Sequence, residues 1–454
     1  MNRSLVTALV LAAAVAGPGA QAPQKVAVPF DYHTLDNGLK VVLSRDTSAP
    51  TAVVAVYYRI GFRTEPKDRT GFAHLFEHMM FQGSQHLGKN EFIGLVESNG
   101  GILNGSTRFD FTNYFQIVPS HTVETILWAE ADRMRGLNIT QENLTNQQDV
   151  VKNEVKVNVL NQPYGGFPWL DLPQAANTNW YNAHNFYGEL DDLDAATLYD
   201  VRQFFRTYYA PNNAVVVVTG DIDPAATLGW IRRYFGGIPS SKLPPQPDIS
   251  EPRQEKEKRT SREDPLANRP ALALGYHHPP RDTPEFYAMG LIDQILVQGN
   301  DSRLYQALVQ KRGLTGSVAG GANPMLGNMF DVKGPMLWTV YMIHDSDKPA
   351  DEIVKVIDEE VGRLQNAPVT REELELALVK RRSQLYAEQE EFVGFGRANL
   401  LAVFALFDDD PGKINRLEEE FRKVTPELIQ RTAREYLRPT NRTILTIAPK
   451  QEAK

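Results

Sequence analysis

The chain has 454 residues, of which 42% are hydrophobic and 23% charged, with a formal net charge of −8 and no cysteine. This composition predicts a globular protein of more than one domain rather than a disordered or fibrous chain. Without cysteine there can be no disulfide, thiolate metal site, cysteine nucleophile or lipid-bearing N-terminal cysteine. The acidic balance, with no concentrated basic segment, argues against a nucleic-acid binder.

Residues 1–22 have the layout of a secretory signal peptide, with an early arginine, an apolar run over residues 5–16 and small residues at Ala20 and Ala22. Cleavage after Ala22 fits the small-x-small pattern, but Pro23 would follow the cut, so cleavage after Ala20 is an open alternative. The apolar run is too short to span a bilayer, and no later segment reaches that length. We therefore expect an exported protein, periplasmic or secreted, with no membrane span.

The chain alternates between strand and helix patterns from its start. Residues 41–43 and 51–58 read as strands, and residues 122–135 have the apolar periodicity of an amphipathic helix. Residues 71–81 also read as a helix, whose apolar residues can pack on a core. Because both halves of the chain mix the two patterns, the expected fold class is α+β.

The helix predicted at residues 71–81 carries the residues with the clearest chemistry. His74 and His78 are four positions apart, about 40° around a helix, so both imidazoles can reach one ion from the same face. Glu77 lies beside them. Zinc binds two neutral imidazoles and a carboxylate, leaves a fourth position for water, and a nearby carboxylate can take that water's proton. The pattern predicts hydrolase chemistry; two unrelated histidines on a surface helix are the alternative.

This His-x-x-Glu-His order resembles the inverzincin motif of the pitrilysin and insulin-degrading-enzyme family, and the likeness covers most of the chain. It implies a zinc metalloendopeptidase with one zinc ion, in which Glu77 is the general base. It also implies a third ligand on a later helix, which matches Glu154, 76 residues after His78.

Two further positions take their expected roles from the resemblance. The segment at residues 99–107 is similar to the family's substrate-side strand, which implies that Asn104 contacts the backbone of a peptide added to a strand edge. Many members carry a second acidic residue seven positions before the third ligand, where this chain has Gln147. An amide can still orient a ligand from behind it but adds no charge.

The ends of the two halves indicate an internal duplication. Residues 206–213 and 434–441 share Arg, Tyr, Pro and Asn at the same spacing, and strand-like residues 214–219 and 443–447 follow. A recurring helix-turn-strand arrangement is the alternative. The predicted organisation is a zinc-binding catalytic repeat at residues 23–238, a linker rich in proline and charge at 239–265, and a second repeat at 266–454.

The second repeat lacks the zinc motif, because Gly290, Asp293 and Gln294 align with the two histidines and the glutamate. In single-chain relatives the later half supplies an Arg and a Tyr, seven positions apart, that bind substrate carbonyls. Val309 and Gly316 align with those positions here. Arg303, Tyr305 and Arg312 lie nearby, so an alignment shift of a few residues is the alternative to loss of the pair.

Larger relatives contain four such repeats that close around a chamber, whereas this chain has two repeats of about 210 residues. The resemblance, which includes the mitochondrial processing peptidase subunits, therefore implies half of a clam-shell chamber. We expect a heterodimer with a homologous, zinc-free subunit that carries the Arg and Tyr, with a homodimer as the alternative. The substrate would be a peptide or an unfolded small protein. A non-catalytic binding subunit and a zinc hydrolase of small amides are the rival functions.

Overall fold

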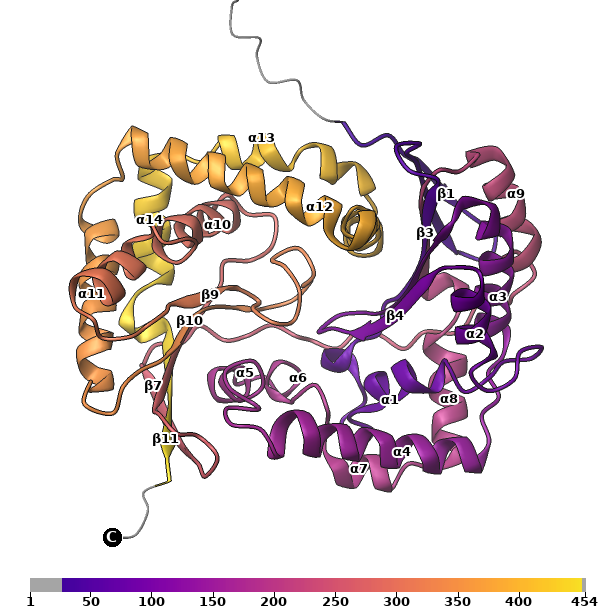
Figure 1. Cartoon of the computed structure of the whole chain (residues 1–454), viewed down its shortest axis with the longest axis horizontal. Coiled ribbons are helices and arrows are strands. Elements are labelled where there is room, and N and C mark those ends of the chain that lie inside the picture. The colour runs from indigo at the N-terminus through magenta and orange to yellow at the C-terminus, as the bar shows by residue number, and fades with distance from the viewer. Residues whose placement is uncertain (1–26, 451–454) are drawn as a thin grey trace, which may run out of the picture.

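The computed structural model describes residues 27–450, which form two mixed α/β repeats, each built on one sheet (Figure 1). The first sheet has the order β1-β2-β6-β3-β5-β4 and the second the order β7-β11-β8-β10-β9. The strands of the first are β1 (Asp31–Thr34), β2 (Lys40–Arg45), β3 (Thr51–Tyr58), β4 (Ile102–Thr107), β5 (Thr112–Pro119) and β6 (Ala214–Gly220). Those of the second are β7 (Lys258–Asp264), β8 (Ala271–His277), β9 (Ala319–Ala322), β10 (Leu337–Ile343) and β11 (Arg442–Pro449).

Apart from β1, the two sheets have the same topology. In the first, β2 pairs in parallel with β6, and the remaining neighbours β6-β3-β5-β4 are antiparallel. In the second, β7 pairs in parallel with β11, and β11-β8-β10-β9 are antiparallel. The predicted α+β class and the duplication are therefore confirmed.

The segments that matched in sequence also adopt the same local structure. A 3₁₀ turn, Pro211–Asn213 in the first repeat and Pro439–Asn441 in the second, leads into an interior strand of each sheet, β6 or β11. The asparagine side chain that ends each turn donates to the carbonyl of Tyr208 (2.8 Å) in the first repeat and of Tyr436 (2.7 Å) in the second. The shared asparagine thus satisfies the carbonyl left free at the end of the preceding helix.

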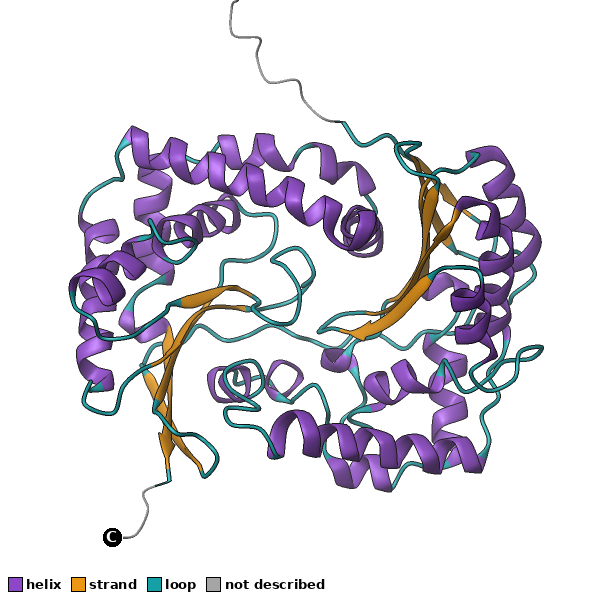
Figure 2. Cartoon of the chain, in the orientation of Figure 1, coloured by secondary structure: helices purple, strands orange, loops and turns teal. Residues whose placement is uncertain are grey.

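Each sheet is covered on its outer face by helices of its own repeat (Figure 2). The helices of the first repeat are α1 (Phe72–Met79), α2 (Glu91–Ser98), α3 (Val123–Arg135), α4 (Gln141–Val155), α5 (Asp171–Ala176), α6 (Trp180–Ala183), α7 (Leu190–Asp194), α8 (Leu198–Tyr208) and α9 (Pro224–Phe235). Those of the second are α10 (Pro284–Leu296), α11 (Ala350–Asn366), α12 (Arg371–Asp408), α13 (Leu417–Arg422) and α14 (Pro426–Tyr436). The helices predicted at residues 71–81 and 122–135 correspond to α1 and α3.

The inner face of each sheet is covered by the other repeat. The backbone of α12 leaves helical geometry from Glu391 to Gly394, and the part beyond this bend packs on the first sheet, where the rings of Phe395 and Phe115 stack 3.7 Å apart. In return, Leu172 of α5 packs among apolar residues of the second sheet. Because each repeat completes the other's core, neither can bury its sheet alone.

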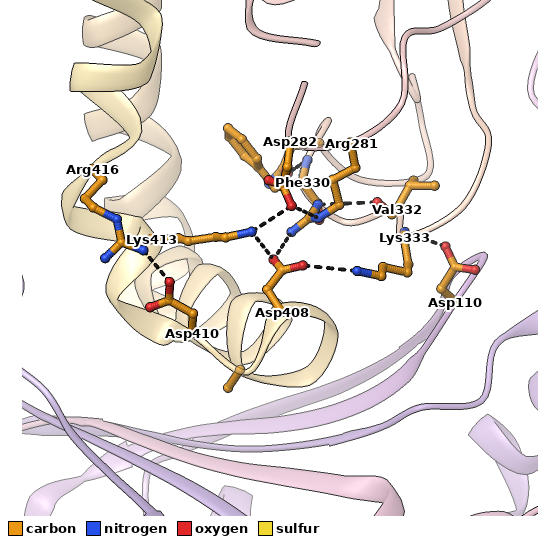
Figure 3. Close-up of polar contacts among 12 residues, drawn as sticks. Asp110, Arg281, Asp282, Phe330, Val332, Lys333, Asp408, Asp410, Lys413 and Arg416 are labelled. Carbon is orange, nitrogen blue, oxygen red and sulfur yellow. Dashed lines mark hydrogen bonds and ion pairs between the residues drawn. The ribbon is translucent and has the colours of Figure 1, made fainter. Parts of the chain in front are cut away.

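A buried carboxylate at the end of α12 also ties the repeats together (Figure 3). Asp408 accepts from Arg281 Nη2 at 2.9 Å and lies 3.1 Å from Lys413 Nζ and 3.2 Å from Lys333 Nζ. The backbone nitrogen of Lys333 donates to Asp110 of the first repeat (2.7 Å). The charge on Asp408 is thus compensated by three cations, as a buried charge requires.

The predicted linker is wrong at its C-terminal end. Residues 239–257 contain neither helix nor strand, but Lys258–Asp264 form β7, so the second sheet begins before the predicted boundary at residue 266. This strand lies at the edge of its sheet and is mostly exposed. Charged side chains protect such an edge from pairing with other chains, and they also gave the segment the composition of a linker.

The predicted signal peptide at residues 1–22 lies outside the described residues. Within residues 27–450, no helix combines the length and apolar character that crossing a bilayer demands.

Candidate metal centre

Helix α1 places His74 and His78 on one face, and its start is fixed by a buried carboxylate. Gly71 precedes the helix with a φ of 81°, in the left-handed region that glycine tolerates. Glu65, fully buried, accepts from the backbone nitrogens of Gly71 (2.9 Å) and Ala73. These donors have no partner within the helix, so Glu65 satisfies them and holds the first turn in place.

The third expected ligand comes from α4, which packs against α1. Thr140 caps the start of α4 by accepting from the backbone nitrogen of Asn143 (3.2 Å). Glu154 lies near the end of this helix, where its side chain is 28% exposed and points toward the two histidines. The structure therefore brings together side chains that are far apart in the sequence.

The three side chains form a compact triangle of ligand atoms. His74 Nε2 and His78 Nε2 are 3.3 Å apart, and Glu154 Oε2 lies 3.1 Å from His78 Nε2 and 3.6 Å from His74 Nε2. Ligands bonded at about 2.0–2.1 Å to a tetrahedral zinc ion lie about 3.3 Å apart. The geometry and the donor set both fit zinc. Among residues 27–450, this is the one group of three or more such side chains close enough to share an ion.

The protonation states also suit a metal site. Burial, reinforced by the neighbouring His78, lowers the pKa of His74 to about 3, so its imidazole is neutral and can act as a ligand. Burial alone would raise the pKa of Glu154, but its contacts with the two histidines and Tyr187 leave that pKa below its ordinary value. The carboxylate is therefore charged at neutral pH.

Glu77 lies beside the triangle and meets the requirements of a base. Burial raises the pKa of its carboxyl, and the hydrogen bond from Thr107 and the charges of His78 and Arg108 oppose this. The hydroxyl of Thr107 donates to Glu77 Oε2 at 2.8 Å. Within residues 27–450, the other oxygen, Oε1, accepts no hydrogen bond and is available for proton transfer.

Asn104 lies on β4, the edge strand of the first sheet, next to the metal centre. Its side chain is exposed, and its Oδ1 accepts from the backbone nitrogen of Gly105 (2.8 Å). A Cβ atom at Gly105 would lie 3.2 Å from Glu77 Cγ, so the absence of a side chain at this position lets β4 approach α1 closely. An edge in this place can accept a peptide as an added strand.

Gln147 is buried on α4, seven residues and about two turns before Glu154. Its amide nitrogen donates to Asn146 Oδ1 (2.8 Å). Within the described part of the chain, no hydrogen bond joins Gln147 to His74, His78 or Glu154, so its expected support of a ligand stays a prediction.

The second repeat places different side chains at the corresponding helix. Gly290, Asp293 and Gln294 lie on α10, and all three are buried. Asp293 accepts from Trp338 Nε1 (2.9 Å) and Gln298 Nε2 (3.0 Å). Its two oxygens are thus occupied by neutral donors.

The two positions that align with the substrate-binding Arg and Tyr of single-chain relatives are also in the second repeat. Val309 belongs to a π-helical turn at Tyr305–Lys311, and Gly316 follows it. Of the neighbouring candidates, Arg303 makes two hydrogen bonds of 2.7 Å to Glu373, and Arg312 is paired with Glu359. Both arginines are therefore engaged within their own repeat.

Three residues that support the centre were not predicted: Glu65, Thr107 and Tyr187. The hydroxyl of Tyr187 donates to Glu154 Oε1 at 3.2 Å. Burial and the charge of Glu154 raise the pKa of Tyr187 to about 12, so the hydroxyl stays protonated as a donor. Single residues of these types carry no spacing that would mark them in a sequence.

Comparisons with known proteins point to one peptidase family. A family model described as Insulinase (Peptidase family M16) matches residues 40–164, and one described as Peptidase M16 inactive domain matches residues 195–379. The zinc protease PqqE of Helicobacter pylori is 25% identical over 423 residues, 92% of this chain and 92% of that protein. A probable mitochondrial-processing peptidase subunit beta of Arabidopsis thaliana is 24% identical over 210 residues, 46% of this chain and 39% of that protein.

Solved structures show the same fold. A protease from Helicobacter pylori matches with a TM-score of 0.85 and 24% identity, over 93% of this chain and all of that one. The periplasmic protease PqqL from Escherichia coli matches with a TM-score of 0.74 and 17% identity, over 94% of this chain but 48% of that one. The first half of PqqL, solved separately, is matched over 94% of its length. The two-repeat chain therefore has the architecture of one half of a clam-shell chamber, as expected.

Proposed function

The chain belongs to peptidase family M16, the insulinase family, and we propose that it is a zinc-dependent endopeptidase that hydrolyses peptides or unfolded small proteins after export. The observation that carries this proposal is the triangle of His74, His78 and Glu154 with Glu77 beside it. A module that only binds peptides has no need for a base next to two metal ligands.

The roles of the residues follow from their positions. Zinc, when bound, would supply the Lewis acidity that activates water and polarises the scissile carbonyl. His74 and His78 would hold the ion through their imidazole nitrogens, and Glu154 would offer it one carboxylate oxygen. Glu77 Oε1 accepts a proton from the attacking water and delivers it to the leaving amine, while Thr107 fixes the opposite oxygen.

A peptide substrate fits the free edge of β4 better than a small amide does. Added as a strand at this edge, the peptide would run past Glu77, which Gly105 allows to lie close to the strand. Asn104, exposed on the same strand, would contact the substrate backbone. Main-chain pairing of this kind selects extended segments rather than particular side chains.

A homologous, zinc-free partner would complete the active site. This chain resembles one half of PqqL, and its own second repeat holds Val309 and Gly316 where the Arg and Tyr are expected. A heterodimer would supply both the other half of the chamber and these side chains, whereas a homodimer would supply the chamber alone. The expected location is the periplasm or the exterior, in keeping with the layout of residues 1–22.

One rival function has specific support. Gln147 in place of an acid and the missing Arg and Tyr would suit a binding subunit that keeps zinc without turnover. The complete set of zinc ligands and Glu77 favours catalysis over this reading.

The test is hydrolysis of a mixed, quenched peptide library by the purified mature protein, with and without a chelator. The protein is assayed alone and with a homologous protein encoded by a neighbouring gene. Chelator-sensitive cleavage only with the neighbour would support a split active site, and cleavage by the isolated chain would remove the need for an Arg and Tyr in trans. No cleavage in any combination, with zinc bound, would favour the binding subunit.

A further inference from the structure

The two carboxylate oxygens of Glu154 face different partners. Oε2 is the oxygen that points at the two histidines. Oε1 accepts from the hydroxyl of Tyr187 at 3.2 Å and, at 3.4 Å, from the exposed amide of Asn158. With Oε1 held, the carboxylate cannot rotate freely, and Oε2 is presented to an ion in one orientation.

Tyr187 packs against both helices that carry the zinc ligands. Its ring lies 5.2 Å from the ring of His74, edge to face, and it shares an apolar cluster with Val155, the residue after Glu154 on α4. The side chain is only 5% exposed. A residue buried in this way keeps one rotamer, so its hydroxyl has a fixed direction.

The backbone around Tyr187 is locked to the start of α1. A Cβ atom at Gly188 would lie 2.2 Å from the backbone nitrogen of Gly71, and one at Gly71 would lie 2.5 Å from the carbonyl oxygen of Tyr187. The backbone nitrogen of Glu189 donates to Thr70 Oγ1 at 2.8 Å. Tyr187 therefore moves with the helix that carries His74 and His78.

Phe186 provides an internal comparison. Its ring also packs on His74, with centroids 4.6 Å apart. Shape and apolar contact at the histidine are thus already supplied by a side chain without a hydroxyl. What Tyr187 adds is the hydrogen bond to Glu154 across the gap between α1 and α4.

We propose that Tyr187 is a positioning residue that aligns Glu154 with the two histidines before zinc binds. This inference rests on the proposed zinc site and concerns the chain's own residues. Hydrogen bonds from outside the ligand set that orient a ligand are typically worth about 10- to 100-fold in metal affinity. The role belongs to the hydroxyl and not to the ring.

The experiment compares Tyr187→Phe with the wild-type chain. Zinc affinity is measured by competition with a chromophoric chelator, and thermal unfolding of the metal-free proteins is recorded in parallel. We expect the zinc Kd of Tyr187→Phe to rise about tenfold, with the unfolding temperature of the metal-free chain little changed.

Tyr57→Phe is the matched control. The hydroxyl of Tyr57 is also buried and donates one hydrogen bond, to Asn399 Oδ1 at 2.8 Å, on the inner face of the first sheet. Its removal should leave the zinc Kd unchanged. An equal loss of zinc affinity in both variants would overturn the proposal, because affinity would then follow the general loss of a buried hydrogen bond.

The remaining outcomes separate this inference from the proposed function. A zinc Kd of Tyr187→Phe equal to that of wild type would overturn the role of Tyr187 and leave the zinc site intact. A wild-type chain that binds no zinc would overturn both. Weaker zinc binding in Tyr187→Phe alone supports the proposal, whether or not the isolated chain cleaves peptides.

Discussion

Glu77, partly buried on α1, and Asp293, buried on α10, are carboxylates on corresponding helices of the two repeats. Burial raises the pKa of both, that of Asp293 to about 6. Their partners differ: Asp293 receives a neutral donor on each oxygen, whereas Glu77 receives one, from Thr107, and lies beside the candidate metal ligands. A raised pKa is therefore shared by a structural and a candidate catalytic carboxylate. The free oxygen and the neighbouring ligands distinguish the two.

The strongest test of this comparison is the loss of each carboxylate in turn. Glu77→Gln should lower turnover by about 10²- to 10⁴-fold, the usual contribution of a general base, while zinc content stays at one per chain. Asp293→Asn should leave turnover unchanged. Peptide hydrolysis by the catalytically competent assembly and metal analysis of both variants check this. An active Glu77→Gln would remove the proposed base.

Asp293 in the second repeat should contribute to the pH dependence of stability. Burial holds the pKa of Asp293 at about 6, above its ordinary 3.8, despite hydrogen bonds from Trp338 and Gln298 and the nearby charges of Arg381 and Lys380. The folded state therefore binds this proton more tightly, and the stability that Asp293 contributes is lost as the pH rises from about 4 to about 6, by up to about 3 kcal/mol.

Asp293→Asn should remove this contribution, because an amide does not ionise. Urea unfolding of the wild type and the variant between pH 4 and pH 7 measures the difference. The same slope in both proteins would show that another group titrates.

Removal of zinc should lower the free energy of unfolding, because the candidate metal centre in the first repeat would lose its ion. At free zinc 100-fold above its Kd, binding adds about 2.7 kcal/mol to the free energy of unfolding, which a chelator removes. His78→Ala should show no such change, because one ligand is missing. Thermal unfolding with and without chelator compares the two proteins, and an equal chelator effect in His78→Ala would place the metal elsewhere.

A smaller effect is expected from the donors that hold each carboxylate. Thr107→Val removes the hydrogen bond that lowers the pKa of Glu77, so the acidic limb of the pH–rate profile should move to higher pH. Gln298→Ala removes the corresponding donor from Asp293 and should cost about 1 kcal/mol of stability. A shifted rate profile in Gln298→Ala would mean that the repeats are coupled in catalysis.

Local spacing explains why part of the centre could be predicted. His74, Glu77 and His78 lie within one helical turn and a half, so the sequence determines their relative positions as soon as α1 forms. Glu154 could be predicted as a ligand only from the resemblance to a family, since no local pattern connects it to α1. The structure brings its Oε2 to 3.1 Å from His78 Nε2.

Two features could not be predicted from the sequence: the edge strand β7, and the packing of α12 and α5 on the sheet of the other repeat. The charges of β7 indicated a linker because an exposed edge strand and a linker have the same composition. The packing of α12 on the first sheet and of α5 on the second has no local signature, because any amphipathic helix can cover any apolar sheet face.

The sequence alone determined the periodic elements, the duplicated strand-forming ends and the histidine pair, because each depends on residues close together in the chain. Tertiary structure decided how many donors each carboxylate receives, since Thr107 and Trp338 come from strands far away in the sequence. It also placed Tyr187 between the two ligand helices. Contacts of this kind arise from packing across the fold, which spacing along the chain does not encode.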